Sequence, residues 1–148
     1  MVSLADSIIQ GIRDYISSCP LLTDGKVKVN YLGSEMVSYT IDEVPTETLV
    51  KRYMDGSSVR KFQFIFASRE AYSASVLENM KVSGFYEQFS DWMEQQNMLK
   101  NLPILPDNCE AKNIRTLTNG YTLNADAQAK QQRYQIQCEL RYLKRRNA

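Results

Sequence analysis

A ten-residue alternation near the end of the chain limits the possible folds most. Residues 133–142 place apolar or aromatic side chains at every second position: Tyr134, Ile136, Cys138, Leu140 and Tyr142. Arginine, glutamine and glutamate fill the positions between them. Because successive side chains of a strand point to opposite faces of a sheet, the pattern predicts a strand with one buried and one solvated face. At about 3.3 Å per residue it would be about 33 Å long, which favours an antiparallel sheet.

Shorter segments predict strands at residues 26–31, 37–42, 49–53 and 59–67, and a threonine-rich stretch predicts another extended segment at 111–123. Gly33 and Ser34 are typical of a turn, and Pro45 of a bend or a sheet edge. Asp55 followed by Gly56 predicts a hairpin turn that requires positive φ. Three phenylalanines at spacing two, Phe62, Phe64 and Phe66, indicate a stripe of the core rather than a platform for a ligand.

Helical spacing predicts three helices. Isoleucines recur every fourth residue within residues 3–17, and Cys19-Pro20 ends that helix. A second helix, with Ser68 as its N-cap, is predicted to reach about residue 82, and Ser83-Gly84 separates it from a third over 85–96. The proline-containing segment 102–108 is interpreted as a surface crossing back to the sheet, with a peptide-type docking segment as the alternative.

The predicted fold is therefore an α+β single domain covering residues 1–148. Its mostly antiparallel sheet is packed by an N-terminal helix and a central helical pair. A chain of 148 residues buries enough surface to fold without a metal or a disulfide.

The absence of histidine from the sequence argues against Ser-His-Asp and Cys-His nucleophilic catalysis, which need an imidazole base, and against common zinc sites. No phosphate-binding loop is present, so we expect no cofactor, no metal and no enzymatic activity. The carboxylates Asp42, Glu43 and Glu47 are interpreted as a solvated turn, with an acid/base or metal site as the alternative. Cys138 is expected to be a core residue, and three scattered cysteines indicate a reducing compartment.

A net charge of +1 gives no overall field toward nucleic acid or membrane. We expect no sequence-specific nucleic-acid binding, and no apolar run is long enough to span a bilayer. The first ten residues do not have the pattern of a signal peptide. The basic end, Arg141 with Lys144 to Arg146, is either solubilising or a contact for phosphate or an acidic partner.

Seven segments, in order over nearly the whole chain, resemble a family of proteins encoded by phages and prophages of Gram-positive bacteria. They are residues 12–20 (IRDYISSCP), 29–33 (VNYLG), 38–45 (SYTIDEVP), 53–57 (YMDGS), 64–72 (FIFASREAY), 83–86 (SGFY) and 133–138 (RYQIQC). Members of that family look like minor capsid (minor tail) or tail-terminator proteins. The order of predicted elements suits the fold that this resemblance implies.

The resemblance implies a virion structural protein at the head-tail junction, assembled in the host cytoplasm. It would be a homo-oligomer, a hexameric ring that caps the tube of major tail protein and meets the head-completion or connector proteins. Two alternatives stay open: a head-completion or connector adaptor subunit, and a small non-viral binding module. The family supplies no catalytic residues to transfer.

On physical grounds, contacts with other subunits are expected in two polar loops that project from strands. The predicted interface residues are Lys51, Arg52, Tyr53, Arg60, Gln128, Lys130 and Gln132. The alternative is that both loops are solvated turns.

Overall fold

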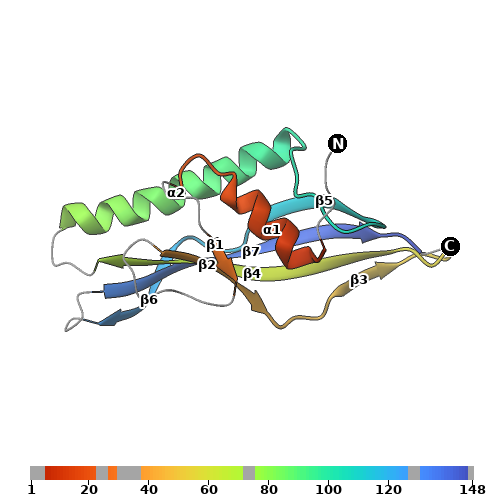
Figure 1. Cartoon of the computed structure of the whole chain (residues 1–148), viewed down its shortest axis with the longest axis horizontal. Coiled ribbons are helices and arrows are strands. Elements are labelled where there is room, and N and C mark those ends of the chain that lie inside the picture. The colour runs from red at the N-terminus through yellow and green to blue at the C-terminus, as the bar shows by residue number, and fades with distance from the viewer. Residues whose placement is uncertain (1–5, 23–26, 30–37, 72–75, 127–130, 147–148) are drawn as a thin grey trace.

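The long alternating segment forms the strand β7, and it lies at the centre of the sheet with β4 in the computed structural model (Figure 1). The structure describes residues 6–22, 27–29, 38–71, 76–126 and 131–146. The elements, in chain order, are α1 (Ile8–Ser17), β1 (Val27–Val29), β2 (Ser38–Val44), β3 (Leu49–Arg52), β4 (Ser58–Ala71), α2 (Val76–Met98), β5 (Cys109–Thr116), β6 (Tyr121–Asp126) and β7 (Gln131–Lys144).

Two long antiparallel strands, β4 and β7, pair along their whole length, from Ser58 opposite Lys144 to Ala71 opposite Gln131. Each carries two shorter strands on its other edge. β2 and β3 both pair with β4, and β5 and β6 both pair with β7. β4 and β7 are thus longer at both ends than their predicted segments. The predicted antiparallel arrangement is confirmed for these pairs.

A parallel pair was not predicted. β1 runs parallel to β2, with Val27 opposite Tyr39. A parallel pair needs a crossover connection, so a tight hairpin cannot join these two strands. The predicted turn at Gly33-Ser34 lies outside the described residues.

Both helices cover the same face of the sheet (Figure 1). The covered face carries the predicted stripe: Phe64 and Phe66 are fully buried, and Phe62 packs against the core. The five predicted inward side chains of β7 are buried as well. The sheet face opposite α1 and α2 is called the outer face below. One hydrophobic core therefore joins both helices to the sheet in a single small α+β domain.

The predicted central helical pair is wrong: α2 is one continuous helix of 23 residues. Gly84 lies inside it, at a point where an added Cβ would meet no atom within 4 Å. A glycine within a helix costs only about 1 kcal/mol relative to alanine, which packing of the rest of the helix offsets. Phe89 and Met93 supply that packing, and so does Tyr86, which the periodicity did not single out.

Ser68 is not a helix cap, because β4 continues through it to Ala71. Its side chain is fully buried, and its hydroxyl hydrogen-bonds the Tyr86 hydroxyl at 2.7 Å. Tyr86 in turn donates to the backbone carbonyl of Tyr134 at 3.0 Å. The preference of serine for caps is local, and it is outweighed here by the ladder that β7 offers to the end of β4.

The segment between α2 and β5 is more buried than a surface crossing. Pro103 and Leu105 are buried, and the Leu105 side chain belongs to the core. The segment lies so close to α1 that a Cβ added at Gly11 would stand 2.4 Å from the carbonyl oxygen of Ile104. The Tyr15 hydroxyl donates to the carbonyl of Asn101 at 2.8 Å and fixes the start of the segment. α1 begins at its N-cap, Ser7, which accepts from the amide of Gln10.

Candidate interaction surfaces

The hairpin between β3 and β4 has the turn that Asp55-Gly56 predicted. Gly56 has a φ of +94°, and the Asp55 carboxylate accepts from the amide and the hydroxyl of Ser57, at 2.9 and 2.6 Å. Hydrogen bonds from the Ser57 side chain and then its amide lower the pKa of Asp55. These two hydrogen bonds therefore support the turn at the tip of the hairpin.

Exposed apolar side chains gather on this hairpin. All four residues of β3 are exposed, Leu49 and Val50 among them. Tyr53 is 41% exposed, and Met54 projects fully into solvent. The exposed edge of a strand can pair with another chain, and grouped apolar side chains mark surfaces that are covered in an assembly. These exposed side chains make the hairpin a candidate interaction surface.

Four of the seven predicted interface residues can be placed. Lys51, Arg52 and Tyr53 are exposed, and the Lys51 ammonium lies 5.1 Å from the centre of the Tyr53 ring. Arg60 is half-buried and donates to the Ser58 hydroxyl at 3.1 Å. Gln128 and Lys130 lie outside the described residues, and for Gln132 only its backbone place in β7 is described.

The predicted solvated face of β7 is wrong at two positions. Gln135 and Glu139 lie on the outer face, yet both are only 3% exposed. Arg133 and Tyr121 hydrogen-bond the Gln135 amide, at 2.9 and 2.8 Å. Long polar side chains of neighbouring positions therefore shield the strand from water. Alternation along one strand does not contain this information, because most of the shielding side chains belong to other strands.

Glu139 is the centre of a further polar cluster on this face. Its Oε2 accepts from Arg115 at 3.1 and 3.0 Å and from Arg141 at 3.3 Å, and its Oε1 accepts from Gln63 at 3.4 Å. Burial alone raises the pKa of Glu139, but the hydrogen bonds of Arg115 and Gln63 and the arginine charges outweigh burial and lower it. Sequence reasoning missed this cluster, since its members come from β4, β5 and β7.

Glu139→Gln is expected to lower the free energy of unfolding at pH 7 by about 1–2 kcal/mol, because charge-assisted hydrogen bonds are lost. A lowered folded pKa means that the ionised group stabilises the fold above its unfolded pKa, about 4.3, and that this contribution disappears as pH falls through the folded pKa. The difference in free energy of unfolding between the wild type and Glu139→Gln should therefore become smaller in acid. Urea unfolding at several pH values measures it. The control Glu94→Gln, on the exposed side of α2, should leave the free energy of unfolding unchanged both at pH 7 and in acid. A stability difference between Glu139→Gln and the wild type that persists in acid would contradict the role given to the ionised Glu139.

The three carboxylates around Pro45 do not act as one group. Asp42 lies on the outer face, where Arg133 donates to it at 2.6 Å and Thr40 at 3.1 Å. Glu43 and Glu47 are exposed. No cluster of three or more potential metal ligands occurs among the described residues. Asp42 is therefore part of an ion pair on the sheet, and Glu43 belongs to β2 and not to a turn as predicted, while Glu47 lies between β2 and β3.

Cys138 is fully buried in the core, as predicted. Burial raises the pKa of its thiol, and burial likewise raises that of Cys19 and Cys109. Raised values keep all three thiols protonated at neutral pH, the form that is a weak nucleophile. The cysteines are free.

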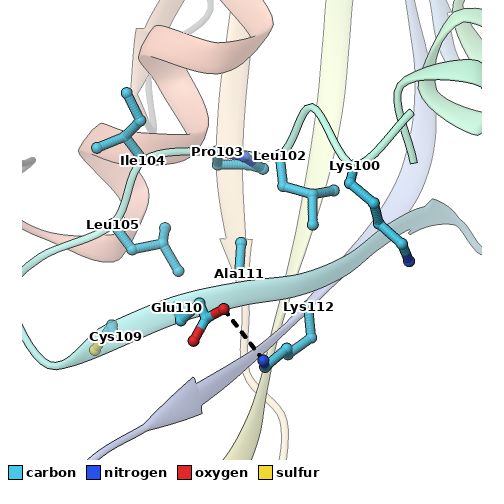
Figure 2. A pocket seen from close by; sticks show the side chains of 9 residues that line it. All are labelled: Lys100, Leu102, Pro103, Ile104, Leu105, Cys109, Glu110, Ala111 and Lys112. Carbon is cyan, nitrogen blue, oxygen red and sulfur yellow. Dashed lines mark ion pairs between the residues drawn. The ribbon is translucent and has the colours of Figure 1, made fainter. Parts of the chain in front are cut away.

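A hollow of about 580 Å³ lies between β5 and the segment before it (Figure 2). Leu102 and Leu105 reach into it from the segment, and Ala111 faces them from β5. Lys100 and the ion pair of Glu110 with Lys112, 3.2 Å apart, stand at its rim. The hollow combines an apolar floor with a charged rim.

The chain matches no protein-family model and no curated protein. None of the described helices is both long enough and apolar enough to cross a bilayer.

Proposed function

We propose that this protein is a phage tail terminator: a non-catalytic virion subunit that caps the tail tube, stops its polymerisation and joins tail to head. It would assemble in the host cytoplasm as a ring of copies, six by the family resemblance. Its neighbours would be the major tail protein on one side and the head-completion or connector proteins on the other.

The observation that carries the proposal is the exposed β3–β4 hairpin. A hydrogen-bonded turn presents Tyr53 and Met54 beside Lys51 and Arg52, at the end of a strand with no buried residue. Polymerising subunits use edge strands and projecting hairpins because a neighbouring copy can continue the sheet or clasp the hairpin. A head-to-tail contact of this kind closes into a ring when the rotation that relates neighbouring copies is a whole fraction of 360°. The sequence resemblance supplies the rest: which assembly the ring serves.

Lys51→Glu with Arg52→Glu is expected to weaken ring assembly on the order of tenfold. Replacing two cations with two anions at a contact turns electrostatic attraction into repulsion. A loss of about 1.4 kcal/mol of binding free energy already lowers the affinity tenfold. Tail lengths and the fraction of heads joined to tails, counted by negative-stain electron microscopy after complementation of a gene deletion, measure the effect. The purified variant should melt as the wild type does, since both side chains are exposed.

A matched control carries the same change of charge on the helices, Arg13→Glu with Lys81→Glu, both exposed. It should give tails of normal length. Normal, joined tails from the hairpin variant would contradict the placement of the contact. The deletion itself tests the function: over-long or unjoined tails support a terminator, whereas empty or leaking heads with normal tails indicate a connector subunit.

A further inference from the structure

Two arginines converge on one buried carboxylate on the outer face. Arg115 comes from β5 and Arg141 from β7, and both bond the same oxygen of Glu139. The carboxylate is 3% exposed, whereas the side chains of Arg115 and Arg141 are 54% and 41% exposed. Glu139 therefore holds the two guanidinium groups side by side from beneath, and their outer edges face solvent.

The cluster keeps an excess of positive charge. Two guanidinium groups and one carboxylate leave +1, and neither arginine has an ion pair with another carboxylate among the described residues. Arg141 donates to Glu139 through Nε alone. A guanidinium has five N–H donors in a fixed fork, so most of those of Arg141 remain for a further acceptor. Lys61 lies directly opposite Arg141 on β4 and adds a cation to the same row.

A hollow of about 260 Å³ lies above the arginines, lined by Asn113, Arg115 and Arg141. Its lining offers N–H donors from three side chains, two of them charged. A carboxylate is recognised by this combination, a planar fork for two oxygens and a neighbouring amide donor. Prior fixation by Glu139 reduces the side-chain entropy that binding would otherwise cost.

We propose that this hollow is a binding site for a single carboxylate, supplied by an acidic side chain of a partner protein. The inference that the carboxylate comes from a protein rests on the proposed function. The inference that the hollow binds a carboxylate does not. A nucleic-acid backbone is the less favoured ligand, because affinity for it comes from many phosphate contacts along a basic track. Here the excess charge is local, and the chain as a whole carries only +1.

The test is an NMR titration of the full chain with acetyl-Gly-Glu-Gly amide, followed through the side-chain Nε–Hε signals of its arginines. The signals of Arg115 and Arg141 should shift and saturate, and added salt should weaken the effect. In Arg141→Gln the affinity reported by Arg115 should fall at least about fivefold, the equivalent of roughly 1 kcal/mol for one lost charge-assisted contact. That variant should fold, since Arg115 keeps both of its bonds to Glu139.

Two probes and one variant serve as controls. Acetyl-Gly-Gln-Gly amide should leave the signals in place, and Arg13→Gln, on α1, should bind the acidic peptide as the wild type does. Unshifted Arg115 and Arg141 signals, an unchanged affinity in Arg141→Gln, or tighter binding of an oligothymidine of about twelve nucleotides would overturn the proposal. Tail length in the deletion strain is measured separately, so a failed titration rejects this site without rejecting the terminator.

Discussion

Phe66→Ala is expected to lower the free energy of unfolding by about 3–5 kcal/mol, a large part of the stability of an ordinary domain. Phe66 is fully buried at the centre of β4. Its ring stacks on Phe89 of α2, with the centroids 4.6 Å apart, and on Tyr39 of β2 at 5.6 Å. Removing it leaves a cavity between the sheet and the helix and abolishes these ring contacts, together with a third to Tyr86.

Urea unfolding followed by circular dichroism measures the loss. Met54→Ala is the matched control, since it also removes a large apolar side chain, but one that is fully exposed; it should stay within about 0.5 kcal/mol of the wild type. Equal stability of the two variants would show that α2 does not pack on β4 as described.

Two glycine substitutions are expected to have opposite signs. Alanine normally stabilises a helix by about 1 kcal/mol over glycine, and Gly84→Ala should do so because its Cβ meets nothing within 4 Å. In Gly11→Ala the new Cβ would stand 2.4 Å from the Ile104 carbonyl oxygen and 3.1 Å from a methyl carbon of Leu105. Backbone must move to relieve that overlap, so we expect a loss of about 2–3 kcal/mol despite the better helix former.

Thermal and urea unfolding of both variants measure this contrast. Each replaces a helical glycine with alanine, so the two share the same intrinsic propensity and serve as each other's control. A stabilised Gly11→Ala protein would mean that the 102–108 segment does not rest on α1.

The strands with strict alternation were predicted correctly because their faces differ in a way that one strand's sequence records. Tyr39, Phe64 and Ile136 are buried at the positions that a period of two requires. The helical pair failed for the opposite reason. Ser68 and Gly84 favour a cap and a break locally. The partners that decide their conformation are remote in sequence: β7 pairs with the end of β4 that holds Ser68, and the sheet packs against the helix that holds Gly84.

The candidate surfaces were predictable in part. Polar residues beside Asp55-Gly56 identified the hairpin, and the structure places Lys51, Arg52 and Tyr53 on its exposed side. The exposed aliphatic side chains of the same hairpin, Leu49, Val50 and Met54, were not singled out, because a strand with no buried face has no characteristic period. The cluster around Glu139 could not be read from the sequence either, because Gln63, Arg115 and Glu139 meet only after three strands have paired.

The pairing of β4 with β7 has a consequence for biosynthesis. The strand that completes the centre of the sheet, β7, ends at Lys144, and its partner β4 begins at Ser58, so the outer ends of this ladder lie far apart in the sequence. Until β7 has been synthesised, β4 has no partner along the edge that β7 later occupies. Contacts between such distant segments slow folding toward the millisecond-to-second range, and unpaired edges are prone to aggregate meanwhile. Loss of β7 would therefore remove the central ladder of the sheet and not merely an edge strand.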